Sequence, residues 1–388
     1  MKNLLPLLLM IISIEISCQD KQSLKEYHSA INYADKELSG NGWELLKKNA
    51  AQASVVFVGE DHGLAEIPLL TKNLAFHLNE NGFNTYLGEI GPLSAQRLCT
   101  KMESGEHREW LKNAPLAIPF INWKEELELL EDLNQINMDI HGIDQEFLFS
   151  PIIHLSSLEN LAGEHKDEIQ GMIKKEKKAT NQFLSGGNYL DLFMISSIEK
   201  DFDDLREMFQ QEEAITIINE LQSSFHVYRT MMNGKGKQSN ELRSQMMRDH
   251  FQQVVSKNSN SKVMIKLGAV HCYRENAPTS VEEIGEYVAK KGNSFHILVL
   301  GNQGTINNYT AQSGFNESQK EVPYNIKKRF PVDLSDFLNY TEQNQWSYFD
   351  LKAIRNSKKQ FVDEVRSLAS AYDALIIIPE VTASTNLE

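Results

Sequence analysis

The sequence predicts an α/β fold: a mainly parallel sheet flanked by helices, with a helical insertion over the C-terminal edge of the strands. Three observations predict it. Short apolar runs alternate with segments of helical periodicity, which is the pattern of β-α-β units and parallel sheets. Residues 151–258 contain no strand-like run. The length of 388 residues suits one large domain with an insertion, or two domains.

The first half of the expected core, residues 51–150, holds three apolar runs that read as strands. They cover residues 54–58, 85–87 and 138–140. The segment from Leu64 to Asn79 has helical spacing that ends at Gly82. A long helical stretch follows over about residues 93–135.

The second half of the core, residues 259–388, supplies the remaining strands. Runs at residues 262–267, 295–300 and 374–378 are largely apolar on both faces, as buried parallel strands are. Between the two halves, residues 151–258 read as an insertion of three or four helices, one of them from about Ser239 to Lys257.

The N-terminal segment predicts that the protein is located in the cell envelope. Residues 1–18 combine Lys2, an apolar run and a small residue before Cys18, which is typical of a bacterial lipoprotein signal with an acylated cysteine. We expect a membrane link through this lipid anchor, on a periplasmic or outer-membrane face. An ordinary cleaved signal would instead give a secreted protein. Residues 19–50 are polar and read as a tether and lead-in.

Charge and missing motifs exclude several functions. The 39 basic and 53 acidic residues give a net charge of −14, which argues against a nucleic-acid partner and against docking on anionic lipid by a basic face. No G-x-S-x-G, H-E-x-x-H or P-loop motif occurs. A small-molecule substrate remains the expected partner, and the oligomeric state stays open.

Ionisable residues follow four of the expected strands. Each lies one to three residues after a glycine: Glu60, His62, Glu89, Asp144 and His271. Ligands bind beyond the carboxyl ends of the strands in open parallel sheets. A glycine at these positions lets the backbone approach a ligand closely. We therefore expect these side chains to converge on one site.

The pattern Gly-x-x-His occurs twice, at residues 59–62 and 268–271. Two histidines and two glutamates at one edge can activate a water molecule, since a neutral imidazole accepts its proton and a carboxylate fixes the tautomer. Alternatively, His62, His271 and Glu89 are ligands for a divalent metal. The residues alone leave both interpretations open.

Two residues of the helix at about 239–257 are further candidates. Arg243 and His250 are seven positions apart and share one helix face. We consider Arg243 as a catalytic residue, and Asp144 and His250 as binding residues.

These motifs resemble the erythromycin esterase-like, ChaN-like and TraB/Tiki superfamily. The resemblance rests on the two Gly-x-x-His motifs, on Gly-Glu at residues 59–60 and 88–89, and on Gly-Ile-Asp at residues 142–144. The stretch Val56-Phe-Val-Gly-Glu-Asp-His-Gly63 is most similar to the erythromycin esterase branch. Arg243-Ser-Gln-Met-Met247 resembles the Arg-Asp-x-x-Met element of that branch, with Ser244 in place of Asp.

The resemblance implies a parallel α/β core with a helical insertion over the strand edge. It also implies two catalytic histidines, a pair of glutamates and a site arginine, carried over as His62, His271, Glu60, Glu89 and Arg243. Esterase members open macrolide lactones without a required metal, Tiki members are metal-dependent proteases, and ChaN-like members bind haem. Fold does not determine chemistry, and Asp61 and Ser244 depart from the esterase pattern, so the substrate stays open.

We therefore expect an extracytoplasmic hydrolase that cleaves an ester or amide bond with histidine-activated water and requires no cofactor. In this hypothesis His62 is the base, and Arg243 with His271 stabilises the oxyanion. The alternatives are a ChaN-like lipoprotein that binds haem or a metal for uptake, and a Tiki-like metal-dependent protease.

Overall fold

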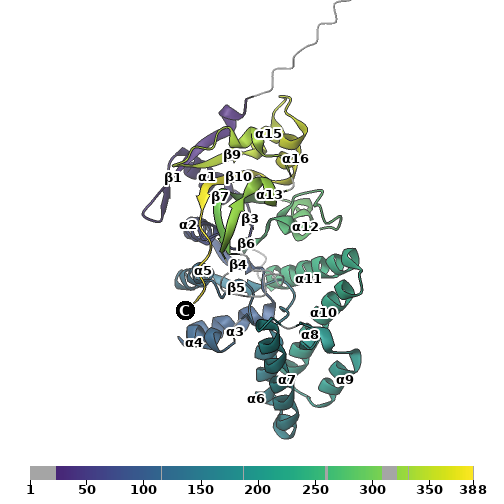
Figure 1. The fold of residues 1–388 in the computed structure, drawn as a ribbon. Helices are drawn as coiled ribbons and strands as arrows, with labels where there is room; N and C mark the ends of the chain where they lie inside the picture. The colour runs from purple at the N-terminus through teal and green to yellow at the C-terminus, as the bar shows by residue number, and fades with distance from the viewer. Residues whose placement is uncertain are drawn as a thin grey trace, which may run out of the picture.

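The computed structural model describes residues 23–387 except residues 115, 187, 258–260, 308–320 and 331. It contains one ten-stranded sheet with the order β2-β1-β9-β10-β7-β3-β6-β4-β5, and β8 pairs with β7. Helices flank the sheet on both faces (Figure 1). The expected α/β class is confirmed. The signal segment and Cys18 lie outside the described residues.

Six strands form the parallel part of the sheet: β3 (Val55–Glu60), β4 (Phe83–Gly88), β5 (Asp139–Gly142), β6 (Lys262–Gly268), β7 (Ser294–Asn307) and β10 (Ala374–Val381). Each overlaps one of the apolar runs identified in the sequence. Their side chains form the largest buried apolar cluster of the described residues. The burial of most residues on both faces explains why these strands are largely apolar.

The direction of the chain along the sheet reverses at its centre. From β3 the chain passes through α2 (Glu66–Glu80) to β4, which lies two strand positions away from β3 in the sheet. From β6 it passes through α12 (Ile284–Lys291) to β7, two places in the opposite direction. Because such crossovers are right-handed, α2 and α12 lie on opposite faces (Figure 1). Ligand sites form at this kind of reversal.

The long helix expected over about 93–135 is three helices: α3 (Pro92–Glu103), α4 (His107–Asn113) and α5 (Lys124–Gln135). Gly105 has a φ of 73°, a left-handed conformation that ends α3 at little steric cost because glycine has no Cβ. Residues 117–123 form turns between α4 and α5. The helical periodicity of the sequence continues across these breaks because each of the three helices buries an apolar face.

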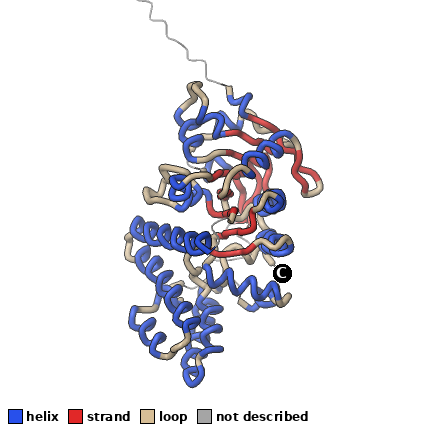
Figure 2. The backbone as a smooth tube through the Cα atoms, turned by 180° about the vertical axis from the view of Figure 1, so that it is seen from behind, coloured by secondary structure: helices blue, strands red, loops and turns tan. Residues whose placement is uncertain are grey.

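The insertion is confirmed as helical but contains more helices than the three or four expected. The described residues hold α6 (Pro151–Leu161), α7 (Lys166–Leu184), α8 (Phe193–Ser196), α9 (Glu199–Glu207), α10 (Glu212–Met232) and α11 (Gly236–Lys257). They form a helical lobe beside β5, visible from both sides in Figures 1 and 2. The lobe has a buried apolar cluster of its own, joined by Leu93 of α3.

The other end of the sheet is antiparallel, which the sequence reading did not anticipate. β1 (His28–Ala34) pairs with β2 (Glu37–Ser39) and with β9 (Trp346–Asp350), and β9 pairs with β10. The described part of the expected tether is therefore part of the folded domain. Its apolar residues explain this, since Ile31, Trp43 and Leu46 are at most 5% exposed.

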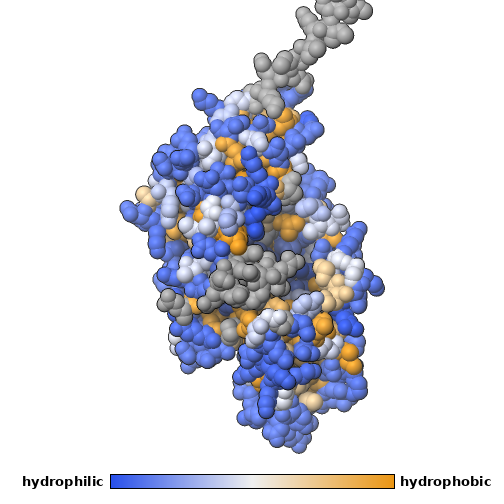
Figure 3. Space-filling model, viewed as in Figure 1, coloured by the Kyte–Doolittle hydropathy of each residue, from blue (hydrophilic) through white to orange (hydrophobic). Residues whose placement is uncertain are grey.

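The remaining elements complete the layers. They are η1 (Leu24–Tyr27), α1 (Asn41–Ala51), η2 (Gly163–His165), η3 (Ala269–Cys272), β8 (Glu321–Asn325), α13 (Ile326–Arg329), α14 (Ser335–Leu338), α15 (Leu351–Asn356) and α16 (Asp363–Ala371). The face drawn in Figure 3 is mostly hydrophilic, with small separate apolar areas. Within the described ranges, every helix is too short or too polar to cross a bilayer.

Candidate active site

The carboxyl ends of four adjacent strands carry the expected ionisable residues. Each lies at or just beyond the end of β3, β4, β5 or β6: Glu60, His62, Glu89, Asp144 and His271. Hydrogen bonds and ion pairs connect all five, either directly or through Arg243 of α11. The structure therefore brings these residues together at one edge of the sheet.

His62 lies between two carboxylates. Its Nδ1 is 2.9 Å from Glu60 Oε1, and its Nε2 is 3.4 Å from Glu89 Oε2. Burial by itself would lower the pKa of His62, but the two carboxylates outweigh it and raise the pKa to about 10. At neutral pH His62 is therefore an imidazolium, suited to donating a proton or stabilising negative charge.

Glu89 is the centre of the cluster. Its Oε1 accepts a hydrogen bond of 2.7 Å from Arg243 Nη2, and its Oε2 accepts one from the backbone N–H of Gly268. Burial opposes ionisation, but the positive neighbours His62 and Arg243 hold the pKa of Glu89 well below its ordinary value. A Cβ on Gly268 would lie 3.0 Å from His62 Nε2. The glycine thus makes room for both side chains.

Arg243 connects the insertion to the sheet. Its Nε and Nη2 donate to the two oxygens of Asp144 at 2.8 and 2.6 Å, a bidentate geometry that fixes the guanidinium plane. The side chain is 27% exposed, and its Nη1 makes no hydrogen bond to the described residues. Its Nη1 hydrogens are therefore free to contact a bound molecule.

His271 has a different partner. Its Nδ1 is 2.8 Å from Glu283 Oε2, and the other oxygen of Glu283 accepts a hydrogen bond from Thr279. In the neutral imidazole that donates to Glu283, Nδ1 carries the proton and Nε2 is an acceptor. The Nε2 atom lies 3.7 Å from Glu89 Oε1, so it faces the cluster. Nothing in the sequence pattern pointed to Glu283.

A buried lysine behind the site was also missed. Lys266 of β6 is 4% exposed and contacts both Glu60 and Glu126 of α5. Burial raises the pKa of Glu126 to about 7 despite this lysine. The available signal was a lysine between apolar residues near the end of the run at 262–267, since an interior lysine needs a buried partner. The second oxygen of Glu60, Oε2, is buried without a hydrogen-bond partner among the described residues.

An aromatic ring covers one face of His62. The Phe120 ring is stacked on the imidazole, with centroids 4.0 Å apart and 10° between the planes. Phe120 has a φ of 65°, a left-handed conformation that costs a bulky residue about 1–2 kcal/mol. Such strain concentrates at functional sites, and here it places a ring against an imidazolium.

Two residues considered from the sequence face away from the cluster. His250 is 6% exposed, and its ring nitrogens face the carbonyl oxygen of Ile143 and the carboxylate of Glu220. It therefore supports the loop that carries Asp144. Asp61 forms a bidentate ion pair with Arg329 of α13.

A second histidine–carboxylate network lies between the core and the insertion. Glu146 accepts hydrogen bonds from the backbone N–H groups of Leu93 and Ser94 at the start of α3, and its Oε2 is 2.7 Å from His154 Nε2. Ser94, Glu146 and His154 are all 0% exposed. A substrate cannot reach this serine, so the network is structural and attaches α6 to α3.

The cluster at the strand edge does not fit a divalent metal. Both oxygens of Glu89 already accept hydrogen bonds, and His62 Nδ1 faces Glu60. The guanidinium of Arg243 would also repel a dication at this point. Over the described ranges, no group of three or more His, Cys, Asp or Glu side chains is arranged to hold a metal.

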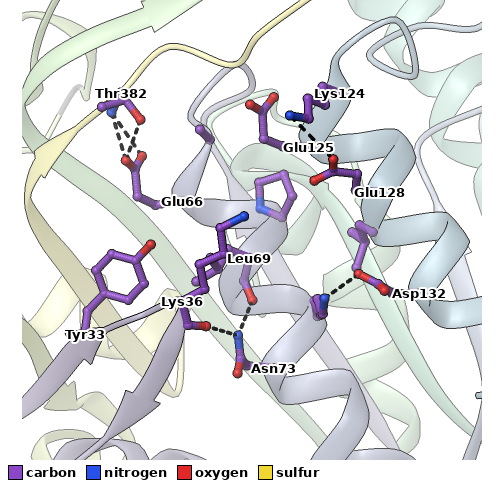
Figure 4. Close-up of a pocket in the computed structure, with 14 residues that line it drawn as sticks. Tyr33, Lys36, Glu66, Leu69, Asn73, Lys124, Glu125, Glu128, Asp132 and Thr382 are labelled. Atoms are coloured by element: carbon purple, nitrogen blue, oxygen red, sulfur yellow. Dashed lines mark hydrogen bonds and ion pairs between the residues drawn. The ribbon is translucent and has the colours of Figure 1, made fainter. Parts of the chain in front are cut away.

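A separate cavity of about 250 Å³ lies between α2 and α5 (Figure 4). Its polar residues largely pair with one another, as in the contacts of Lys72 with Asp132, Lys124 with Glu128 and Thr382 with Glu66. None of the residues in the strand-edge cluster lines it.

Comparison with known proteins supports the fold. The sequence matches no protein-family model and no curated protein. A mutant of erythromycin esterase EreC in its open conformation is 16% identical, with a TM-score of 0.63 over 93% of this chain and 99% of that one. A succinoglycan biosynthesis protein is 14% identical, with a TM-score of 0.60 over 94% of this chain and 97% of that one.

A protein from Bacillus cereus is similar as well, at 20% identity and a TM-score of 0.57, over 93% of this chain and 97% of that one. These structures define the class: an α/β protein with the fold of erythromycin esterase EreC. The resemblance read from the sequence motifs is thereby confirmed at the level of the fold.

Proposed function

We propose that this protein is an extracytoplasmic hydrolase that cleaves an ester or amide bond by histidine-activated water. The observation that carries the proposal is the cluster at the strand edge. There, two histidines with carboxylate partners and a partly exposed arginine all lie against Glu89. The fold shared with an erythromycin esterase supports an ester as the substrate class. The sequence of residues 1–18, with Cys18 after a small residue, supports the location.

The two histidines are suited to opposite roles. His271 has Nδ1 held by Glu283, and its Nε2 is left to accept a proton from water. His62, with a pKa of about 10, is suited to donating a proton. We therefore propose His271 as the base, in place of the role given to His62 from the sequence alone.

The reaction then follows from these contacts. Water attacks the carbonyl carbon while His271 Nε2 accepts its proton, and the oxyanion is stabilised by Arg243 Nη1 and the His62 imidazolium. On collapse, the carbon–oxygen bond to the leaving group breaks, and His62 supplies the proton that the leaving alkoxide needs. Glu60 and Glu89 hold the imidazolium in position.

A screen of the purified protein against ester, lactone and peptide panels, each with and without chelator, tests the proposal. We expect turnover of an ester or lactone that chelator does not reduce. His62→Gln and His271→Gln should each lower kcat/KM by about 10²–10⁴, the range for general acid–base catalysis. His226→Gln is the matched control, because His226 is exposed on α10.

Two results would overturn the proposal. One is the absence of turnover with every class of substrate. The other is equal activity in His62→Gln, His271→Gln and the control. A shift of the Soret band on titration with haem, together with inactive panels, would favour the alternative role in haem binding.

A further inference from the structure

A second cavity lies within the helical insertion, away from the strand-edge cluster. It has a volume of about 320 Å³ and is lined only by residues 168–208, from α7, α8, α9 and the segments beside them. Figure 1 places these three helices in the lobe beyond α10 and α11. The volume is within the range of small-molecule sites. The proposed hydrolase reaction uses none of its residues.

One wall of this cavity contains a buried carboxylate with an unused oxygen. Glu176 of α7 is 2% exposed. Its Oε2 accepts a hydrogen bond of 2.8 Å from the backbone N–H of Phe193, whereas its Oε1 is buried with no partner among the described residues. A buried acceptor without a partner is costly. A donor bound in the cavity would remove that cost.

The charges around the cavity favour a cation. Five carboxylates line it, Glu168, Glu176, Asp191, Asp201 and Asp204, against one basic residue, Lys175. Three of them have partners of their own: Asp201 accepts from the backbone N–H of Ile198, Asp204 pairs with Lys200, and Glu168 lies 4.0 Å from His165. Acidic side chains therefore outnumber basic ones in the lining by five to one, and Asp191 and Glu176 form no ion pair among the described residues.

The rest of the lining is apolar. Met172, Phe193, Leu205 and Met208 line the same cavity as Glu176. Methionine side chains adapt to varied shapes, and an aromatic ring attracts a nearby cation. The carboxylates are not arranged to hold a metal, since the described residues contain no such group of three. The lining therefore fits an organic cation better than a metal ion.

We propose that this cavity binds an organic ammonium ion carried on a small apolar body. Its N–H groups donate to Glu176 Oε1, and its apolar part packs against Phe193 and the two methionines. Burial raises the pKa of Glu176 to about 7, so the carboxylate is ready to ionise when a cation arrives.

Calorimetric titration of the purified chain tests this site with three probes that share one ring: phenethylammonium, phenethyl alcohol and 3-phenylpropionate. We expect phenethylammonium to bind about 10- to 100-fold more tightly than the alcohol, as a hydrogen bond to a charged group predicts. The propionate should not bind. Glu176→Gln should weaken the binding of phenethylammonium by a similar factor.

Two further variants make the result decisive. Glu207→Gln removes the same charge from an exposed position on α9 outside the cavity. This variant should bind phenethylammonium as tightly as the wild type does. Met208→Trp fills the cavity and keeps the carboxylate, so it should abolish binding even if Glu176→Gln fails to fold. Equal affinity for the ammonium and the alcohol, or unchanged binding by folded Glu176→Gln or Met208→Trp, would overturn the proposal.

Discussion

Replacing Glu89 by glutamine should lower the pKa of His62 measurably. The two charges lie 3.4 Å apart, which corresponds to an attraction of roughly 5 kcal/mol at an effective dielectric constant of about 20. The His62 side chain is 25% exposed, so solvent screens part of this energy. Opposite charges at such separations shift a pKa by about 1–3 units. The pKa of His62 should therefore fall from about 10 to between roughly 7 and 9. It should stay above its ordinary value because Glu60 still contacts the imidazole.

NMR titration of histidine-labelled protein measures this change, with the His62 signal assigned from the spectrum of His62→Gln. Glu207→Gln is the control, since it removes one negative charge from an exposed site on α9. The reasoning is refuted if His62 titrates near 6.5 in the wild type, or at the same pH in the wild type and Glu89→Gln. Either result would return His62 to the list of candidate bases.

The same contact predicts how stability depends on pH. Because the folded pKa of His62 lies above its unfolded value of 6.5, the bound proton stabilises the fold fully below pH 6.5. This contribution is lost as the pH rises through about 10. In Glu89→Gln the loss should begin at the same pH, set by the unfolded histidine, but should be complete at a lower pH, because the folded pKa of His62 is lower. Chemical denaturation of both proteins at a series of pH values measures the difference.

Four other predictions follow from the described contacts. His62→Ala should lower activity by about 10²–10⁴ and should also lower thermal stability, because Glu60 and Glu89 lose the imidazolium and Phe120 loses its stacking partner. Lys266→Met should destabilise the fold by about 3–5 kcal/mol in urea denaturation, because Glu60 and Glu126 lose their buried cation; adding Glu126→Gln should restore part of the loss. Cys18→Ala should abolish labelling by a fatty-acid analogue, and persistent labelling would reject the anchor. Chelator treatment and metal analysis of the purified protein should show no bound metal on which activity depends.

The strands and the site edge could be predicted because both depend on local pattern. The run at residues 54–58 is apolar on both faces, and the glycine and ionisable residues after it mark where the strand ends. Parallel pairing then brings such ends together without further information. The same logic placed Asp144 and His271 at the same edge of the sheet as Glu60.

Other parts of the site depend on contacts that no local pattern encodes. Glu126 and Lys266 are 140 positions apart and meet only because α5 packs against the sheet near β6. Phe120 reaches His62 through a turn whose φ of 65° is unfavourable for its residue type. The antiparallel strands β1 and β9 were missed for a related reason, since they pair with each other across about 300 residues and carry little alternation of their own.

The place of β6 in the sheet has a consequence for the order of folding. β6 lies between β3 and β4, yet it is synthesised after both of them and after the whole insertion. The pairing of β3 with β6 joins residues roughly 200 positions apart, and such non-local pairing slows folding. Until β6 emerges from the ribosome, β3 and β4 lack their common neighbour and expose apolar strand edges. The nascent chain is therefore most prone to aggregation in the interval between synthesis of β5 and synthesis of β6, which is also the interval in which a chaperone would have the greatest effect on yield.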